Sequence, residues 1–343
     1  MVLRSFTENL KPRWIWFEVT DRCNSRCTHC NIWRKKATEH PLTPEEIERV
    51  FKDPLFQKLD SIINSGGEAA IRNDIEEVLF AEHRALPQAN LHLSTNGLLP
   101  ERILEVVRAM AKNDIPIEIG VSIDGIGRKH DLIRGVEGNF AKADWLLREL
   151  VSMGNRYGGK IVPVIGFTLT DLTVDSFEEV RDYAEEIKAD LVVQWYNESS
   201  FYDNVAKKLT DRIAKREKMI KIVKSLPPSL LNERWVNWLK GGSIKFQCFA
   251  MHTFVTLKCN GDFIPCLNFW ETKAGNVREH TPTQIWHSWG AKKARTLVKN
   301  CQGCLNSWGV GWSAASSFYP NLFFHLRHRN ILFEKLKRKF YRR

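Results

Sequence analysis

Over its first 200 residues the chain alternates short apolar runs with amphipathic segments. The apolar runs are rich in β-branched and aromatic residues and predict strands over 14–19, 61–64, 90–93, 117–121, 161–168 and 191–195. Between them the pattern predicts helices: one follows Thr43-Pro44-Glu45-Glu46, and others lie near 72–83, 100–112, 138–153 and 174–187. Six strand–helix units imply a parallel sheet with right-handed crossovers, either a barrel or an open doubly wound sheet.

Each predicted strand ends in a polar or glycine-rich junction. These junctions are Thr20 through the first cysteines, 65–68, 94–97, 122–125, 168–170 and 194–197. In a β/α barrel all such carboxyl-terminal ends open at one mouth, where these folds keep their chemistry. Six units therefore predict an α/β fold, a partial (β/α)6 TIM-like barrel over 14–200 that is open on one side. Gln194 and Tyr196 are expected to face the mouth.

After residue 200 the alternation stops. A helical connector is predicted over 201–245, with helices at 205–224 and 228–240. A small α+β domain follows over 246–312, with a hairpin around Asn260-Gly261 and a helix near 281–299. The segment 313–343 is predicted to be a basic amphipathic C-terminal helix, because Leu322, Leu326, Phe333, Leu336 and Phe340 fall near helical spacing among cationic residues. Such a helix would dock on the barrel, bind an acidic partner or make peripheral contact with a membrane.

Composition and charge narrow the class of protein. The chain has 343 residues, 43% hydrophobic and 27% charged, which excludes a disordered or collagen-like chain. No apolar stretch reaches the roughly 18 residues of a membrane span, and the N-terminus has no apolar signal region, so we expect a cytoplasmic protein. Eight Lys or Arg and one Glu in 327–343 supply +7 of the net charge of +11. Nucleic acid is therefore an unlikely partner for the body, although an RNA-modifying enzyme remains an alternative.

The eight cysteines form two groups separated by more than two hundred residues. A disulfide scaffold would scatter its cysteines through a small exported domain, so these thiols are better interpreted as metal ligands. Cys23, Cys27 and Cys30 follow the first predicted strand directly. Structural zinc needs a fourth ligand, and the neighbouring His29 is badly placed for it. Three thiolates suit a four-iron cluster with one iron left open.

The segment 23–30, CNSRCTHC, resembles the CxxxCxφC signature of the radical S-adenosylmethionine (SAM) superfamily, with His29 in the φ position. The resemblance implies that SAM chelates the open iron of a [4Fe-4S] cluster through its methionyl amine and carboxylate. One electron then cleaves the sulfonium, and the resulting 5′-deoxyadenosyl radical abstracts a hydrogen atom from the substrate. A flavodoxin or ferredoxin is the expected electron donor.

Further motifs support the resemblance up to about residue 200. Ser65-Gly66-Gly67-Glu68 resembles the family's GGE(P) element at the methionyl amine, with Ala69 in place of proline, and 94–97 resembles its STNG run. Ser122 with Asp124 resembles a ribose-binding S-x-D-G run, and 130–135 resembles HDxIRG, whose arginine pairs with the cofactor carboxylate. The implied cofactor-binding residues are His29, Gly66, Gly67, Glu68, Ser94, Asn96, Ser122, Asp124 and Arg134. Without the resemblance, Glu68 would be a solvated loop acid, Asp124 a helix cap and Arg134 a partner in a surface ion pair.

The second cysteine group resembles the C-terminal SPASM domain or its shorter form, twitch, which carry auxiliary iron–sulfur clusters. The full form has seven cysteines for two clusters, and five are present here. The resemblance therefore implies one auxiliary cluster of the [4Fe-4S] type, held by Cys248, Cys266, Cys301 and Cys304, with a zinc ribbon as the alternative. Cys259 is left over as a spare ligand, a hydrogen-atom donor in catalysis or an inert thiol.

These resemblances imply hydrogen-atom abstraction, with the auxiliary cluster accepting the substrate's second electron in a net oxidation. The first strand begins at about Trp14, so we expect no peptide-recognition domain before the barrel. That expectation favours a small-molecule or glycan-like substrate. A peptide-modifying enzyme (crosslinking, thioether formation or epimerisation) is the first alternative, and a zinc-ribbon scaffold without catalysis is another.

Overall fold

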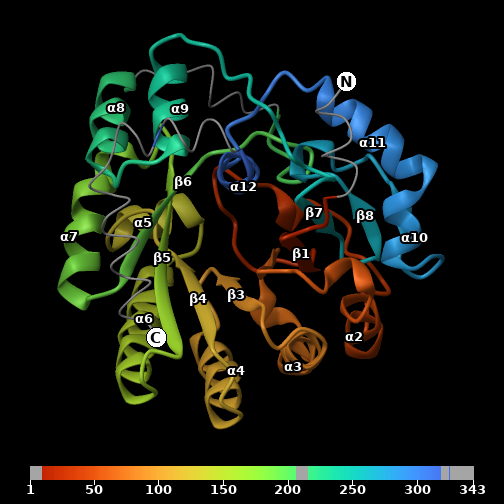
Figure 1. Cartoon of the computed structure of the whole chain (residues 1–343). Coiled ribbons are helices and arrows are strands. Elements are labelled where there is room, and N and C mark those ends of the chain that lie inside the picture. The colour runs from red at the N-terminus through yellow and green to blue at the C-terminus, as the bar shows by residue number, and fades with distance from the viewer. Residues whose placement is uncertain (1–9, 206–214, 318–323, 325–343) are drawn as a thin grey trace.

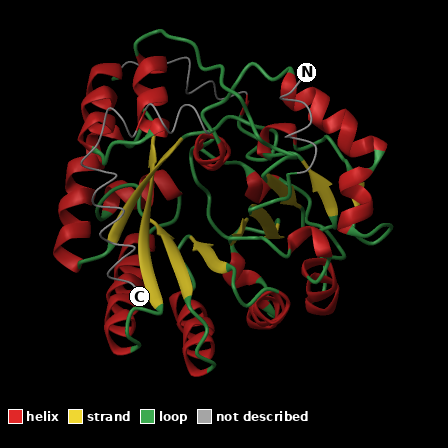
Figure 2. Ribbon diagram, viewed as in Figure 1, coloured by secondary structure: helices red, strands yellow, loops and turns green. Residues whose placement is uncertain are grey.

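The computed structural model describes residues 10–205, 215–317 and 324. Its described strands form one nine-stranded sheet in the order β6-β5-β4-β3-β2-β1-β7-β8-β9. The first six are parallel neighbours: β1 (Trp14–Thr20), β2 (Ser61–Gly66), β3 (Asn90–Thr95), β4 (Ile117–Ser122), β5 (Ile161–Leu169) and β6 (Asp190–Trp195). The sheet curves around an opening, with helices on its outer side (Figures 1 and 2). The predicted partial barrel is therefore confirmed.

The outer helices match the predicted amphipathic segments. They are α2 (Pro44–Phe51), α3 (Ile75–Ala85), α4 (Pro100–Lys112), α6 (Asn139–Arg156) and α7 (Phe177–Ile187). Thr43 and Glu46 form a reciprocal capping box at the start of α2, as the start signal indicates. A further short helix, α5 (Arg128–Arg134), follows β4 and was not predicted. It ends at Gly135, whose left-handed φ of 69° favours glycine.

Successive side chains of each strand alternate between two faces of the sheet, one packed against the outer helices and one lining the interior of the barrel. In β1 the side chains of Ile15, Phe17 and Val19 belong to the main hydrophobic core, whereas Trp16 lines the interior. Successive side chains of a strand point to opposite faces, so polar residues can occupy the interior face without disturbing that core.

The C-terminal part is joined to the barrel through the sheet itself. Strand β7 (Phe254–Leu257) pairs in parallel with β1, and β8 (Asp262–Ile264) and β9 (Gly275–Asn276) continue the sheet in antiparallel fashion. The predicted hairpin is thus present, and Gly261 at its turn has a φ of 89°. The helices of this part are α8 (Arg216–Ser225), α9 (Leu230–Leu239), α10 (Pro282–His287), α11 (Trp289–Lys299) and α12 (Ser307–Ser316).

The single helix expected near 281–299 is wrong, because the structure has two. Ser288 ends α10 and caps α11 by accepting a hydrogen bond from the amide of Ala291. Gly290, near the start of α11, lies so close to the carbonyl of Ala274 that a side chain there would overlap it. Glycine therefore permits this close packing just after the chain changes direction between the two helices.

Helix α12 lies across the open side of the barrel (Figure 1). Ser307 Oγ accepts a hydrogen bond of 2.7 Å from the amide of Trp195 in β6, and Trp312 packs 5.2 Å from Phe254 in β7. The helix continues past residue 312, where the sequence predicts a boundary. Most of the predicted basic tail lies outside the described residues. In the part of the chain that is described, no helix has the length and apolar character needed to cross a bilayer.

A buried carboxyl group makes the stability of the fold depend on pH. Glu82 of α3 is fully buried against β2, where Asn64 donates a hydrogen bond of 2.8 Å to it. Burial raises the pKa of Glu82 from an ordinary value near 4.5 to about 8. The unfolded chain therefore loses this proton at lower pH than the folded chain, and the free energy of unfolding should fall as pH rises from about 4.5 to 8.

We expect Glu82→Gln to remove this pH dependence, because glutamine keeps the acceptor for Asn64 and never ionises. At pH 8 the variant should exceed the wild type by about 3–4 kcal/mol in urea unfolding, and the two should nearly agree at pH 5. Glu77→Gln, an exposed position on the same helix, is the matched control. Parallel pH profiles for wild type and Glu82→Gln would contradict the assignment.

Candidate active site

A cavity opens at the carboxyl ends of the six parallel strands. Every one of these strands contributes a side chain to its wall, for example Trp16, Ser65, Ser94, Ser122, Thr168 and Gln194. Trp308 of α12 completes the wall on the open side of the barrel. Cys23, Cys27 and Cys30 also line the cavity, so the predicted mouth and the first cysteine group coincide.

The end of α5 positions the cysteine loop, which we define as residues 21–30. The amides of Arg26 and Thr28 donate hydrogen bonds of 3.0 and 2.8 Å to the carbonyls of Arg134 and Ile133. A side chain at Gly135 would overlap the carbonyl of Arg26, so glycine permits this close packing. The segment that resembles HDxIRG therefore supports the cysteine loop through its backbone.

The glycine pair after β2 holds the loop from its other side. The amides of Gly67 and Glu68 donate hydrogen bonds of 2.7 Å each to the carbonyls of Thr20 and Arg22. A side chain at Gly67 would overlap the Arg22 carbonyl, and one at Gly66 would overlap that of Thr20. Both glycines line the cavity, but the close backbone approach that they permit is to the cysteine loop.

The environment of the three thiols suits a cationic metal cluster. Burial is the main reason why the pKa of Cys23 is raised to about 11 and that of Cys30 to about 12, and the charges of neighbouring cysteines act in the same direction. Ser25 Oγ lies 3.1 Å from the sulfur of Cys27, and the guanidinium of Arg134 lies 3.8 Å from it. Three thiols from one loop that line the same cavity are soft donors that can become thiolates when iron binds.

The side chain of Glu68 does not lie at the cavity wall, where the resemblance to the GGE(P) element implies a contact with SAM. Its side chain is fully buried and accepts hydrogen bonds from Thr95 Oγ1 at 2.7 Å, from the amide of Asn96 at 2.6 Å and from the amide of Ala70 at 3.1 Å. It does not line the cavity. This bonding does not fit the predicted direct contact with a methionyl amine. It fixes the 94–97 segment, and Asn96 in turn reaches to 3.9 Å from the sulfur of Cys23.

Asp124 and Arg134 form an ion pair of 2.7 Å that is buried, not on the surface. Burial is the largest single influence and raises the pKa of Asp124, but the Arg134 guanidinium, together with His29, His130 and the amide of Thr168, lowers it below its ordinary value. Asp124 also accepts a hydrogen bond from the amide of Thr168 and does not line the cavity, so neither the ribose contact nor the helix-cap alternative fits. Arg134 does line the cavity, and its buried Nε has no hydrogen-bond partner among the described residues. That donor is available to an anionic group of a ligand.

The other predicted cofactor-binding residues lie on the cavity wall. His29, Ser94, Asn96 and Ser122 line it together with Gln194 and Tyr196. The His29 ring meets the Tyr196 ring edge to face, with centroids 6.4 Å apart. The Tyr196 hydroxyl is buried without a hydrogen-bond partner in the described part of the chain, which leaves a donor for a bound molecule.

The structure brings together Cys248, Cys266, Cys301 and Cys304. Burial is the main reason why the pKa values of Cys248 and Cys304 are raised and that of Cys266 is raised to about 12, and charges on other members of this group act in the same direction. Among the described residues, no three His, Cys, Asp or Glu side chains converge as tightly as a single metal ion needs.

Cys259 lies apart from both cysteine groups. Its amide donates a hydrogen bond of 3.2 Å to Glu18, and its thiol lies 3.6 Å from the hydroxyl of Thr38. The residue is buried and does not line the cavity. Of the three interpretations of Cys259, this position favours the inert thiol over the spare ligand and the hydrogen-atom donor.

An aromatic layer connects the two cysteine groups. Trp16, Phe201 and Trp270 form a cluster that packs against Cys23 and Cys30 and also against Trp308 and Trp312. Trp312 in turn packs in the cluster of Phe249 and Phe254 that contains Cys248 and Cys266. The sequence assigned no role to the tryptophans, and only their unusual number hinted at one.

The sequence did not indicate every residue of the cavity wall. His92 and Glu118 lie side by side on β3 and β4 and both line the cavity. The available signal was the polar alternation 90-92-94 and 118-120-122, which places these side chains on the interior face of the barrel. Both residues lie within predicted strands, whereas most of the predicted cofactor-binding residues lie in the polar junctions that follow the strands.

Comparison with known families identifies the class of protein. Residues 17–177 match the radical SAM superfamily, and residues 248–305 match the SPASM iron–sulfur cluster-binding domain. The chain belongs to the radical SAM superfamily and carries a C-terminal SPASM domain. The family implies a [4Fe-4S] cluster, SAM and auxiliary iron–sulfur binding, and the cysteine-rich cavity fits such cofactors. The zinc-ribbon alternative is not supported.

Individual relatives cover the chain unevenly. The Fe-coproporphyrin III synthase of Methanosarcina barkeri is 30% identical over 188 residues, which are 54% of this chain and 44% of that relative. The chain thus spans less than half the length of this curated relative. Streptococcus suis SuiB bound to the precursor peptide SuiA superposes with a TM-score of 0.61 at 19% identity, over 94% of this chain and 75% of that one.

A second solved structure, anSMEcpe with bound AdoMet, has a TM-score of 0.60 at 17% identity, over 93% of this chain and all of that one. At these identities the two structures show a common fold. Both support the partial barrel with its C-terminal extension.

Proposed function

We propose that this radical SAM enzyme carries out a net oxidation of a small-molecule or glycan-like substrate. The observation that carries the proposal is that the first cysteine group lines the cavity and that the aromatic layer links this group to the second one. When bound, the first cluster and SAM supply the 5′-deoxyadenosyl radical that abstracts a hydrogen atom. The auxiliary cluster on the other side of the layer is suitably placed to accept the second electron.

We assign the first cluster to Cys23, Cys27 and Cys30, because their thiols converge on the cavity within one loop. SAM is proposed to lie along the wall formed by His29, Gly66, Ser94, Asn96, Ser122 and Arg134. The free Nε of Arg134 offers a charged donor for its carboxylate. Glu68 and Asp124 act on this site through Asn96 and Arg134, so they are positioning residues.

We assign one auxiliary cluster to Cys248, Cys266, Cys301 and Cys304, because charges within this group raise the pKa of Cys248, Cys266 and Cys304, whereas no cysteine acts on the pKa of Cys259. The substrate would lie against Gln194, Tyr196 and Asn197, whose amide and hydroxyl groups suit hydroxyl-bearing molecules. A flavodoxin or ferredoxin is the proposed reductant.

Peptide modification is the second candidate. It is supported by the likeness in fold to SuiB, which was solved with a precursor peptide, and to anSMEcpe, which was also solved with a peptide. Incubation of the reduced holoenzyme with hydroxyl-bearing compounds such as methyl glycosides and inositols, and in parallel with serine- and cysteine-containing peptides, separates the two. Loss of two hydrogen atoms from a compound, detected by mass spectrometry, supports the first candidate. Modification confined to peptides supports the second.

Removal of the auxiliary ligands should uncouple SAM cleavage from substrate oxidation. In the Cys248→Ala/Cys304→Ala variant we expect iron to fall from about eight to about four atoms per chain. Formation of 5′-deoxyadenosine should persist, while the oxidised product is lost, because the second electron has no acceptor. Cys259→Ala is the matched control and should keep its iron. A double variant with full iron, or with unchanged product, would refute the assignment.

A further inference from the structure

Three polar side chains form a hydrogen-bonded line along the cavity wall. Ser94 Oγ lies 3.0 Å from Nε2 of His92, and Nδ1 of His92 lies 2.7 Å from Oε1 of Glu118. All three residues face the same cavity as the first cysteine group. The line therefore runs from Ser94, in the wall of the proposed SAM site, to a carboxylate further along the interior of the barrel.

The surrounding residues hold the imidazole in this orientation. His92 is buried, and its ring packs edge-on against Trp308 with centroids 5.9 Å apart. A Cβ at Gly120 would lie 2.8 Å from Cε1 of His92, so glycine at this position leaves the space for the ring. The nearby wall residues Val164 and Val192 are apolar. A polar line on a partly apolar wall is a specific feature and not part of a solvated surface.

The geometry defines a direction for proton transfer. Because an ionised Glu118 can only accept, Nδ1 of His92 carries the hydrogen of that bond. Nε2 of the neutral ring is then an acceptor and receives the hydroxyl hydrogen of Ser94. If Ser94 takes a proton from a bound group, it passes its own proton to His92, and Glu118 stabilises the resulting imidazolium.

The far end of the line reaches water. The side chain of Glu118 is 45% exposed, whereas that of His92 is 8% exposed. Protons that arrive at the imidazole can therefore leave through a solvated carboxylate. This exit distinguishes the arrangement from a sealed structural hydrogen-bond network.

We propose that Ser94, His92 and Glu118 form a proton relay that takes up the hydroxyl proton of an alcohol substrate as it is oxidised. The inference rests on the proposed function. The substrate carbon first gives its hydrogen atom to the 5′-deoxyadenosyl radical. The remaining hydroxyalkyl radical then loses its O–H proton to the relay and one electron to the auxiliary iron–sulfur cluster. The carbon–oxygen single bond becomes a carbonyl, and the substrate has lost two hydrogen atoms in total.

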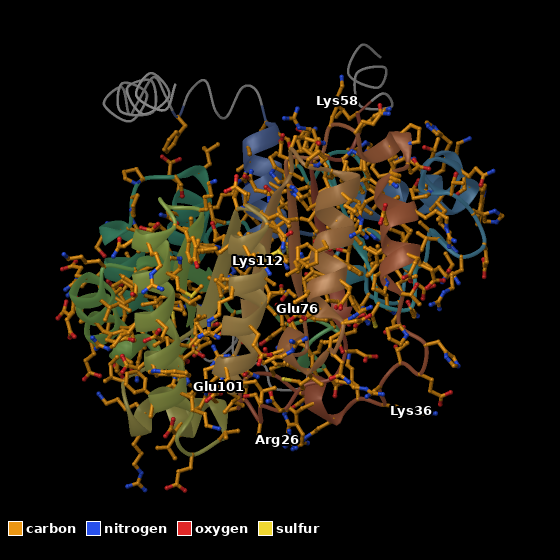
Figure 3. All side chains as sticks on the ribbon, turned by 90° about the horizontal axis from the view of Figure 1, so that it is seen from below. Arg26, Lys36, Lys58, Glu76, Glu101 and Lys112 are labelled. Carbon is orange, nitrogen blue, oxygen red and sulfur yellow. The ribbon has the colours of Figure 1, made fainter. Side chains whose placement is uncertain are left out.

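The test compares His92→Gly and Glu118→Gln in the reconstituted holoenzyme with wild type, using the methyl glycoside or inositol that wild type oxidises. We expect the oxidised product to fall about 100-fold in His92→Gly while 5′-deoxyadenosine stays within twofold. Added imidazole should restore at least a tenth of the product. The smaller change Glu118→Gln should give the same uncoupling without loss of the fold. The matched controls are His280→Gly and Glu101→Gln, both exposed, and Figure 3 shows Glu101 at the surface.

A second readout needs no turnover. In a sample with ¹⁵N-labelled histidine, the hydrogen on Nδ1 of His92 should give a downfield resonance from its 2.7 Å bond to Glu118, and this resonance should move upfield in Glu118→Gln and vanish in His92→Gly. An unchanged resonance in Glu118→Gln would overturn the relay, as would product that falls only in step with 5′-deoxyadenosine or that imidazole does not restore. Covalent capture of Ser94 by a fluorophosphonate would instead identify a nucleophile and also overturn it. If wild type forms 5′-deoxyadenosine but oxidises no alcohol, the proposed function fails and the relay fails with it.

Discussion

Replacing Cys23, Cys27 and Cys30 together by alanine is expected to abolish formation of 5′-deoxyadenosine. The three thiols line one cavity, and the rest of the cysteine loop is fixed by backbone hydrogen bonds to the ends of β2 and α5. Without these ligands no cluster can present an open iron to SAM. We expect the rate to fall at least about 1,000-fold and iron to fall from about eight to about four atoms per chain.

The measurement is chromatographic quantification of 5′-deoxyadenosine after reduction with dithionite, together with iron analysis of the same sample. Cys259→Ser is the control, because Cys259 contacts Glu18 and Thr38 and no other cysteine. Residual 5′-deoxyadenosine near the wild-type level in the triple variant would show that the cluster is held elsewhere.

Among substitutions that add a single methyl group, Gly67→Ala should have the largest effect on stability and on the first cluster. The added Cβ would overlap the carbonyl oxygen of Arg22, so either that carbonyl moves or the end of β2 does. Movement of either breaks the hydrogen bond from Glu68 to Arg22 and displaces the cysteine loop. We expect the free energy of unfolding to fall by about 2–3 kcal/mol, with loss of the first cluster.

Gly311→Ala tests whether this effect is specific to the site. Gly311 lies in α12, and an added Cβ there would meet only Leu231, at an ordinary distance of 4.0 Å. Alanine also favours a helix by up to about 1 kcal/mol over glycine, so stability should hold or rise. Urea unfolding measures the stability of both variants, and iron analysis shows whether each one keeps the first cluster. Retention of four irons at the first site in Gly67→Ala would contradict the proposed packing.

The barrel could be predicted because its signals are local. Each of the six strands and five outer helices carries its own periodicity and punctuation, and the observed bounds differ from the predicted ones by a few residues. The pairing of β7 with β1 could not be predicted in the same way. A four-residue apolar run specifies a strand but not its partner, and the partner here is about 240 residues earlier in the chain.

The site was predictable only in part, for a similar reason. Spacing alone indicated which cysteines act together, since Cys23, Cys27 and Cys30 share one loop. It could not show whether an acid at a strand end faces the cavity. Glu68 and Asp124 both turn into buried hydrogen bonds, because the amides of Asn96 and Thr168, at the ends of the neighbouring strands, donate to them. His92 and Glu118 escaped notice because their significance comes from the neighbouring strand.

The central claim is that three thiolates in the cysteine loop hold a cluster with one iron open to SAM. Electron paramagnetic resonance of the reduced Cys248→Ala/Cys304→Ala variant tests it most directly, because the remaining signal then comes from a single cluster. Addition of SAM should change the g values of that signal and yield 5′-deoxyadenosine on turnover. A spectrum that is identical with and without SAM, and no 5′-deoxyadenosine, would contradict the account.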